Sequence, residues 1–360
     1  MRYLIPADKT LIVRGPASLK LVGEHATILG APLNQSSNIL IQRGKQLPIE
    51  SEDESEVEIT IGRTGNIMEL NGSSIPESWK SVVNLLADSG KAIILIIGPS
   101  DAGKSSLCTY ILNSLIIRRR EVRVLDADIG QADIGPPTTL ASSAPTTPRP
   151  SLIQLEPERM LFVGHVTPSF VQEEMFQGIK RMLSSDYRGV TIVNTDGWVY
   201  DDAAILYKKR LISIVNPDHL VGIGPRISLN PILHQTKFDT IMVQSPTVTL
   251  PRSRIQRKEI RRSGYRRFLT NATVHTLRLD NTRIKLRRSI TQPCSRGLVN
   301  LSKALLGFLD ENGFMVQIGI LERMTHNHLT AYSRRIHQPV SIKFGYVRLA
   351  RDGTELGFLE

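Results

Sequence analysis

A run of apolar residues that ends in a glycine-rich turn is the feature that most constrains this chain. Residues 93–97 read Ile-Ile-Leu-Ile-Ile, and residues 98–105 read Gly-Pro-Ser-Asp-Ala-Gly-Lys-Ser. This is the spacing GxxxxGK[ST], the pattern of a loop that wraps nucleotide phosphates. Its context agrees, because a strand-like run precedes it and residues 104–117 read as a helix. The pattern predicts a strand, a phosphate-binding loop and a helix in direct succession.

The residue types in this loop suit the binding of a triphosphate. Gly98 and Gly103 let backbone N–H groups approach phosphate oxygens where a Cβ would intrude. Lys104 can neutralise the phosphate charge, and Ser105 can offer its hydroxyl to Mg²⁺. The helix that begins here turns its positive N-terminal end to the anion. The expected nucleotide-binding residues are Gly98, Pro99, Ser100, Asp101, Ala102, Gly103, Lys104, Ser105 and Ser106.

The 360 residues provide enough chain for two or three domains. Residues 1–77 read as short strands, so we expect an N-terminal β domain there. Strands and helices alternate over residues 78–272, which is typical of an α/β domain with a mostly parallel sheet and three layers. A Pro/Ser/Thr-rich stretch, 141–151, reads as a loop that interrupts this alternation, and residues 273–360 read as a C-terminal β domain.

The positive charge of the chain is concentrated in one stretch. The net charge is +11, and residues 252–288 hold thirteen Lys or Arg and two acids, which also gives +11. The rest of the chain is therefore balanced. A solvated basic face is the simplest explanation of a charge run, but on a nucleotide-binding protein such concentration favours a phosphate-rich ligand.

A second polar cluster follows another buried strand. Residues 124–131 read Val-Leu-Asp-Ala-Asp-Ile-Gly-Gln, so Asp126 and Asp128 lie two apart at the carboxyl end of that strand. Phosphates bind at this edge of a parallel sheet. A carboxylate there can organise Mg²⁺ or accept the proton of an attacking hydroxyl. No Asn-Lys-x-Asp segment for reading guanine is found, so ATP is the expected nucleotide.

Five motifs together resemble the family of polynucleotide 5′-hydroxyl kinases, which includes the RNA kinase of mRNA cleavage and tRNA splicing. They are "GPSDAGKSSL" (98–107), "DADIGQ" (126–131), "GHVTP" (164–168), "NTDGW" (194–198) and the Arg-rich segment 252–268, in the order the family has them. The resemblance covers essentially the whole chain, and its length is similar to the archaeal branch. It implies an ATP- and Mg²⁺-dependent enzyme that phosphorylates the 5′-hydroxyl of RNA, with DNA left open, and protein partners from RNA processing.

The resemblance also implies roles for individual residues. Catalysis is assigned to Lys104, to Asp128 as base or metal organiser, and to three arginines of the Arg-rich lid (251–268), namely Arg257, Arg261 and Arg262. Ser105 and Asp128 are the expected metal ligands. The expected substrate-binding residues include Gln131, which lies near Asp128, and Thr167 and Pro168, which lie in the family's clasp segment. Trp198 is the fourth, and its ring could stack on the terminal base.

Several alternatives stay open at this point. Trp198 could be a core residue, and His165 is better read as an orienting side chain than as a proton shuttle. On a helix, Arg257 and Arg261 would share one face, but the sequence does not identify the catalytic arginine. The whole chain could instead be a non-catalytic ATP-binding scaffold or an unrelated P-loop NTPase.

Two widely separated cysteines, Cys108 and Cys294, argue against a disulfide framework. No apolar run is long enough to span a membrane, and no signal-peptide pattern opens the chain. We therefore expect a cytoplasmic protein.

Overall fold

The computed structural model describes residues 1–360 except 185, 235, 280–281, 286–300, 336–338 and 360. Arg287, Arg288 and Cys294, which entered the sequence argument, lie outside the described residues. The chain folds as two compact units. The first consists of Met1–Leu125, Ser143–Glu156 and Leu183–Ile260, and the second of Asp126–Ser142, Pro157–Met182 and Arg261–Glu360. None of the described helices is long and apolar enough to cross a membrane.

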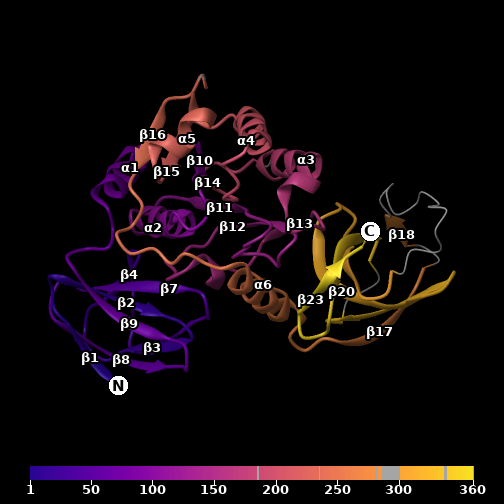
Figure 1. The fold of residues 1–360 in the computed structure, drawn as a ribbon, viewed down its shortest axis with the longest axis horizontal. Helices are drawn as coiled ribbons and strands as arrows, with labels where there is room; N and C mark the ends of the chain where they lie inside the picture. The colour runs from indigo at the N-terminus through magenta and orange to yellow at the C-terminus, as the bar shows by residue number, and fades with distance from the viewer. Residues whose placement is uncertain (185, 235, 280–281, 286–300, 336–338, 360) are drawn as a thin grey trace. The chain divides into compact units, whose positions relative to one another are not determined.

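The N-terminal part of the first unit is all β (Figure 1). It holds two antiparallel sheets, with strand orders β1-β8-β3-β6 and β5-β4-β7-β2-β9. Burial alternates along β6 and β7, which is the pattern of strands with one face on a core. The strands are β1 Arg2–Ile5, β2 Lys9–Arg14, β3 Ala17–Leu21, β4 Thr27–Ile28, β5 Ala31–Pro32, β6 Asn38–Ile41, β7 Gln46–Glu50, β8 Ser55–Ile61 and β9 Asn66–Asn71.

The central sheet has the order β13-β12-β11-β14-β10-β15-β16. Strand β10 pairs in parallel with β14 and β15, and β15 pairs in parallel with β16. Helices α2 and α4 both contact β10, whose residues are almost all buried, so this strand is covered on both faces. The strands are β10 Ala92–Ile97, β11 Val122–Ala127, β12 Thr139–Ser143, β13 Arg159–Phe162, β14 Val190–Thr195, β15 His219–Ile223 and β16 Thr240–Val243. The expected α/β class with a mostly parallel sheet is confirmed.

One expectation about this sheet is wrong. Residues 141–151 were expected to form a loop, yet Ala141, Ser142 and Ser143 belong to strand β12, which pairs antiparallel with β13. Every residue of β12 is buried. Small and hydroxyl-bearing residues can form a buried strand when other strands and helices cover them. The composition of such a segment does not by itself predict that it is a buried strand.

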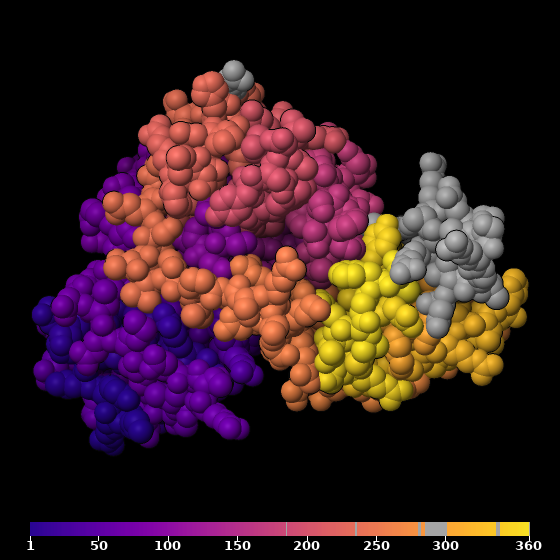
Figure 2. All heavy atoms as spheres, in the orientation of Figure 1, coloured from indigo at the N-terminus to yellow at the C-terminus, as the bar shows by residue number. Residues whose placement is uncertain are grey.

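The described helices include the one expected over residues 104–117, which has the same bounds. They are α1 Glu77–Ala87, α2 Lys104–Ile117, α3 Gln172–Leu183, α4 Asp202–Val215, α5 Arg226–Leu233 and α6 Arg254–Leu269, with short 3₁₀ turns η1 Leu152–Gln154 and η2 Pro168–Phe170. Helix α6 carries the Arg-rich lid, and Figure 2 shows its side chains, in orange, exposed on the face drawn. The division between the two units falls inside this helix.

The second unit is built around a C-terminal sheet with the order β17-β21-β20-β19-β22-β18, and β23 pairs with β22. Its strands are β17 Thr273–Arg278, β18 Arg283–Lys285, β19 Ala304–Leu309, β20 Met315–Met324, β21 His328–Ser333, β22 Ser341–Leu349 and β23 Glu355–Phe358. One apolar cluster joins Phe162, Val166 and the α6 residues Tyr265 and Leu269 to this sheet. The second half of α6 and the clasp segment (164–168) therefore share a core with the C-terminal strands.

Candidate active site

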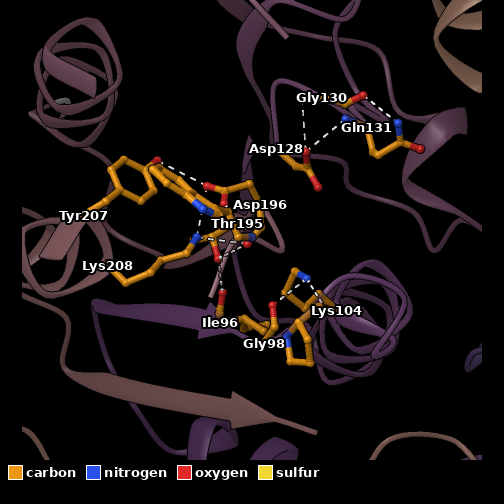
Figure 3. A network of polar contacts seen from close by, with 12 residues as sticks. Ile96, Gly98, Lys104, Asp128, Gly130, Gln131, Thr195, Asp196, Tyr207 and Lys208 are labelled. Atoms are coloured by element: carbon orange, nitrogen blue, oxygen red, sulfur yellow. Dashed lines mark hydrogen bonds and ion pairs between the residues drawn. The ribbon is translucent and has the colours of Figure 1, made fainter. Parts of the chain in front are cut away.

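The glycine loop (98–103) connects β10 to α2 in the first unit. Gly103 has φ 103°, a conformation that side chains rarely adopt, and it forms the N-cap of α2. A Cβ at Gly98 would lie 2.4 Å from the carbonyl oxygen of Ile223, so the loop is packed as closely as only glycine allows. The Lys104 ammonium donates to the carbonyl oxygens of Gly98, at 2.9 Å, and Pro99, at 2.8 Å (Figure 3). Lys104 is buried, so the loop holds a desolvated positive charge.

The first turn of α2 fits a divalent cation. Ser105 is half-buried, and its hydroxyl makes no hydrogen bond to any part of the chain that the structure describes. No three His, Cys, Asp or Glu side chains gather into a metal site among the described residues. Mg²⁺ at a phosphate loop needs no such cluster, because it takes one or two protein oxygens, waters and the phosphates as ligands.

An aspartate inside the glycine loop binds the start of the lid. Asp101 has φ 63°, and its carboxylate accepts hydrogen bonds from the Arg252 backbone N–H at 3.0 Å and from the Arg257 guanidinium at 2.6 Å. The Arg257 Nε donates to the Arg252 carbonyl oxygen at 3.2 Å. Arg257, on the first half of α6, is thus attached directly to the glycine loop.

The turn after β14 also touches the glycine loop. A Cβ on Gly197 would lie 2.3 Å from the Ser100 hydroxyl oxygen and 2.5 Å from its backbone nitrogen. Trp198 follows, and it is half-buried, whereas Trp79 is the tryptophan in the core. The Trp198 ring stacks on Tyr207, with ring centroids 5.5 Å apart, and its indole N–H donates to Asp201 at 2.7 Å. The core alternative for Trp198 is therefore not what the structure shows.

A buried ion pair holds this turn, and sequence analysis missed it. The Lys208 ammonium lies 3.0 Å from Asp196 Oδ2 and donates to the Asp196 carbonyl oxygen at 2.9 Å (Figure 3). Asp196 Oδ1 accepts the Trp198 backbone N–H at 3.0 Å, and the Tyr207 hydroxyl donates to Oδ2 at 3.2 Å. Lys208 is one of three basic residues in a row on α4, and nothing in that run indicates which one is buried.

In the second unit, the two aspartates of "DADIGQ" have different surroundings. Asp126 is the penultimate residue of the fully buried strand β11 and accepts backbone N–H groups from Asp128, Asp133 and Ile134. Burial, together with the negative charges of Asp133 and Asp128, raises the pKa of Asp126 to about 7, against the opposing effect of those N–H donors. Asp126 therefore braces residues 126–134, which we call the acid loop.

Asp128 lies in the turn that follows β11. Its Oδ1 accepts the backbone N–H groups of Gly130, at 3.1 Å, and Gln131, at 2.9 Å (Figure 3). The Gln131 side-chain oxygen is buried and has no hydrogen-bond partner among the described residues. The turn thus presents a half-buried carboxylate next to an unsatisfied acceptor, an arrangement suited to binding a hydroxyl or a cation.

The other two lid arginines lie on the second half of α6 and bind acids of the C-terminal strands. Arg261 makes a bidentate pair with Glu355, at 2.5 and 2.8 Å. Burial opposes its charge, but Glu355 and, more weakly, Asp128 raise the pKa of Arg261 above the ordinary value, so it remains charged. Arg262 pairs with Asp352 at 2.5 Å on the surface. The three lid arginines therefore have three different acidic partners.

The clasp segment contacts the acid loop. A Cβ on Gly130 would lie 2.7 Å from the Val166 carbonyl oxygen. His165 is buried, and its Nδ1 accepts the Thr167 backbone N–H at 2.9 Å, which agrees with an orienting role. Thr167 is exposed and Pro168 is buried. Within this unit, Asp128, Gln131, Thr167 and Pro168 thus belong to two adjoining segments.

Comparison with known proteins agrees with these features. Residues 98–271 match the family model described as "mRNA cleavage and polyadenylation factor CLP1 P-loop". The polyribonucleotide 5′-hydroxyl-kinase of Pyrococcus furiosus is 26% identical over 352 residues, covering 81% of this chain and 99% of the relative. That of Methanocaldococcus jannaschii is 26% identical over 346 residues, covering 80% and 96%. The bovine polynucleotide 5′-hydroxyl-kinase NOL9 is 30% identical over 193 residues, covering 51% of this chain and 28% of NOL9.

Among solved structures, Clp1p in its complex with a Pcf11p fragment superimposes with a TM-score of 0.73 at 12% identity, covering 97% of both chains. A likeness at this identity shows the fold. Residues 98–271 thus resemble the CLP1 P-loop family, and most of the chain is similar to archaeal polyribonucleotide 5′-hydroxyl-kinases and has the Clp1p fold.

Proposed function

We propose that this protein transfers the γ-phosphoryl group of ATP to the 5′-hydroxyl of RNA. The relatives that cover most of the chain are named polyribonucleotide 5′-hydroxyl-kinases, and this supports the reaction and the substrate. The observation that carries the proposal is the attachment of Arg257 to Asp101 of the glycine loop, because it keeps a cation from the lid beside the loop that would hold the phosphates. Phosphoryl transfer needs a cation to stabilise the charge of the transferred group, whereas binding a nucleotide without chemistry does not need one.

In this proposal, the first unit binds the nucleotide. The backbone N–H groups of the glycine loop and Lys104 hold the phosphates, and Ser105 offers its hydroxyl to Mg²⁺. Arg257 neutralises charge that develops on the transferred group, as an arginine finger supplied by the same chain. Its guanidinium can do so while bound to Asp101, because it has five N–H groups and its hydrogen bonds to Asp101 and to the Arg252 carbonyl oxygen use two of them. Trp198 offers a ring on which the terminal base of the acceptor stacks.

The second unit supplies the groups for the acceptor end. Asp128 accepts the proton of the 5′-hydroxyl or serves as a ligand of Mg²⁺, and the unsatisfied Gln131 oxygen supports contact with a hydroxyl. Thr167 and Pro168 are the remaining proposed substrate contacts. Arg261 and Arg262 are proposed to stabilise phosphoryl or backbone charge after exchange of their acidic partners. When bound, Mg²⁺ would neutralise phosphate charge and orient the transferred group.

The domain division, the protein partners and the cellular location are also part of this proposal. The three-part division into 1–77, 78–272 and 273–360 stays a prediction. Clp1p was solved together with Pcf11p, which supports protein partners in RNA processing for this chain. The cysteine usage supports a cytoplasmic location.

The decisive assay uses ATP labelled at the γ-phosphate and a 5′-hydroxyl oligoribonucleotide, with the same oligomer bearing a 5′-phosphate as the control acceptor. Label should move only to the 5′-hydroxyl oligomer, should require Mg²⁺, and should be lost in Lys104→Ala. ATP binding without transfer would select the scaffold. Release of phosphate that RNA does not change would select an unrelated NTPase. A DNA oligomer in parallel tests the acceptor range.

Two matched substitutions on α6 test the role of the lid. Arg257→Ala should lower kcat by roughly 10³-fold or more, the range known for arginine fingers. Arg254→Ala, an exposed neighbour on the same helix, should change kcat little. Equal loss in both variants would mean that α6 contributes only general positive charge.

Trp198→Ala should raise the KM for RNA more than the Kd for ATP.

A further inference from the structure

Two exposed phenylalanine rings flank the buried His165 in the second unit. Phe170 ends the 3₁₀ turn η2 and is 72% exposed, and Phe358 ends β23 and is 48% exposed. Their ring centroids lie 4.8 and 4.9 Å from that of the His165 ring, and Phe358 is nearly parallel to it, at 20°. Figure 2 shows the C-terminal residues, in yellow, open to solvent on the face drawn. We call Phe170 and Phe358 the aromatic pair.

The aromatic pair has a fixed geometry although it is exposed. His165 cannot rotate freely, because its Nδ1 accepts the Thr167 backbone N–H and Tyr346 packs against its edge at 5.6 Å and 75°. Each phenylalanine packs on this fixed ring and leaves much of its remaining surface in water. Exposed apolar side chains that lie close together usually mark a binding surface, because their remaining apolar area would be buried by a partner.

The aromatic pair is continuous with the proposed acceptor site. Gly130 of the acid loop packs on the Val166 carbonyl oxygen, and His165 and Phe170 are close neighbours of Val166 in sequence. Asp128 and Gln131, the proposed contacts of the 5′-hydroxyl, belong to that same loop. A strand whose 5′ end lies at the acid loop could therefore continue along the clasp segment to the two rings.

We propose that the aromatic pair stacks a nucleobase of the RNA acceptor, downstream of its first nucleotide and without regard to base identity. The inference rests on the proposed function and extends it from the 5′ end to the body of the strand. A flat ring is the partner that an exposed aromatic face recognises best, and every base has one. Two exposed rings offer far less area than the roughly 800 Å² that a stable protein interface takes from each partner, which favours a single base as the occupant.

The test is an abasic scan of the acceptor. A 5′-hydroxyl hexaribonucleotide is compared with versions that lack one base at each position from 2 to 6. For the wild-type protein, loss of the stacked base should raise the KM roughly 5- to 150-fold, with kcat almost unchanged. In Phe170→Ala and Phe358→Ala the intact hexamer should show that same rise, and removing the stacked base should then cost nothing more. Phe170→Tyr and Phe358→Tyr should restore binding.

Two controls keep this inference separate from the proposed function and from folding. Ile227→Ala removes another exposed apolar side chain, which is 82% exposed on α5, and should leave all KM values unchanged. A nucleoside 3′-monophosphate is too short to reach the pair, so the phenylalanine variants should phosphorylate it as the wild type does.

Each other outcome has a definite meaning. If the wild-type protein does not phosphorylate the hexamer, the proposed function itself fails. If it does, but no abasic position and neither alanine variant changes the KM, the stacking role is refuted and the kinase assignment stands. Equal impairment of the variants on the nucleoside 3′-monophosphate would show that the rings only support the clasp segment, and would also refute it.

Discussion

The buried ion pair of Lys208 and Asp196 should contribute strongly to the stability of the turn after β14. Both side chains are almost fully buried, at 0% and 5% exposure, and the ammonium makes two contacts to Asp196. Lys208→Met keeps the length of the side chain but leaves the Asp196 carboxylate in the interior without its cation. Removing one partner of a buried ion pair typically costs about 3–5 kcal/mol. That is a large part of the roughly 5–15 kcal/mol by which domains are stable.

A double-mutant cycle separates this coupling from simple loss of packing. Asp196→Asn keeps an oxygen for the Trp198 N–H but removes the charge, so alone it leaves Lys208 unpaired. The double variant has no buried charge to compensate. It should therefore be more stable than the sum of the two single losses predicts, by about 2 kcal/mol or more. Lys209→Met, a neighbour that is half-buried, should stay within about 0.5 kcal/mol of the wild type.

The measurement is urea unfolding at pH 7, with the midpoint and slope determined for all four members of the cycle. Salt up to 0.5 M should leave the coupling almost unchanged, because buried pairs are screened little. If the single losses simply add, within about 0.5 kcal/mol, the pair is not coupled and the reasoning fails. Because Gly197 packs on Ser100, the destabilised variants should also bind ATP more weakly.

Three more predictions follow from the same geometry. Asp101→Asn should lower kcat roughly 10-fold with little change in the KM for ATP, because Asn tolerates φ 63° but holds Arg257 less firmly; initial rates test this, and an unchanged kcat contradicts it. Gly197→Ala should weaken ATP binding, since its Cβ would lie 2.3 Å from Ser100 and overpacking costs about 1–3 kcal/mol, while Gly90→Ala, with nothing within 4 Å, should not; calorimetry measures both. The raised pKa of Asp126, about 7 against an ordinary 3.8, means that the folded protein binds this proton more tightly than the unfolded chain, so the free energy of unfolding should fall by up to about 4 kcal/mol as pH rises from 4 to 7. Urea unfolding across that range should show a steeper decline in the wild type than in Asp126→Asn, and equal slopes would contradict the assignment.

The sequence by itself determined the local elements that bind phosphate. The glycine loop, the strand before it and the helix after it are determined by residues that are close in sequence. An apolar run forms a buried strand, and glycine readily adopts the backbone conformation found at Gly103. The predicted helix over 104–117 accordingly has the bounds of α2, and the apolar run 93–97 lies within β10. Strand β12 escaped prediction because its burial comes from the strands and helices that cover it rather than from its own small residues.

Only the tertiary structure decided which side chains work together. Spacing on α6 predicted that Arg257 and Arg261 share a helix face, but their partners are 156 and 94 residues away along the chain. The burial of Lys208 and the partial exposure of Trp198 are likewise set by the elements packed around them. A helix or a turn forms from interactions between residues that are near in sequence. Ion pairs and stacked rings depend on distant segments that folding brings together, and no local sequence pattern indicates which of these segments will be in contact.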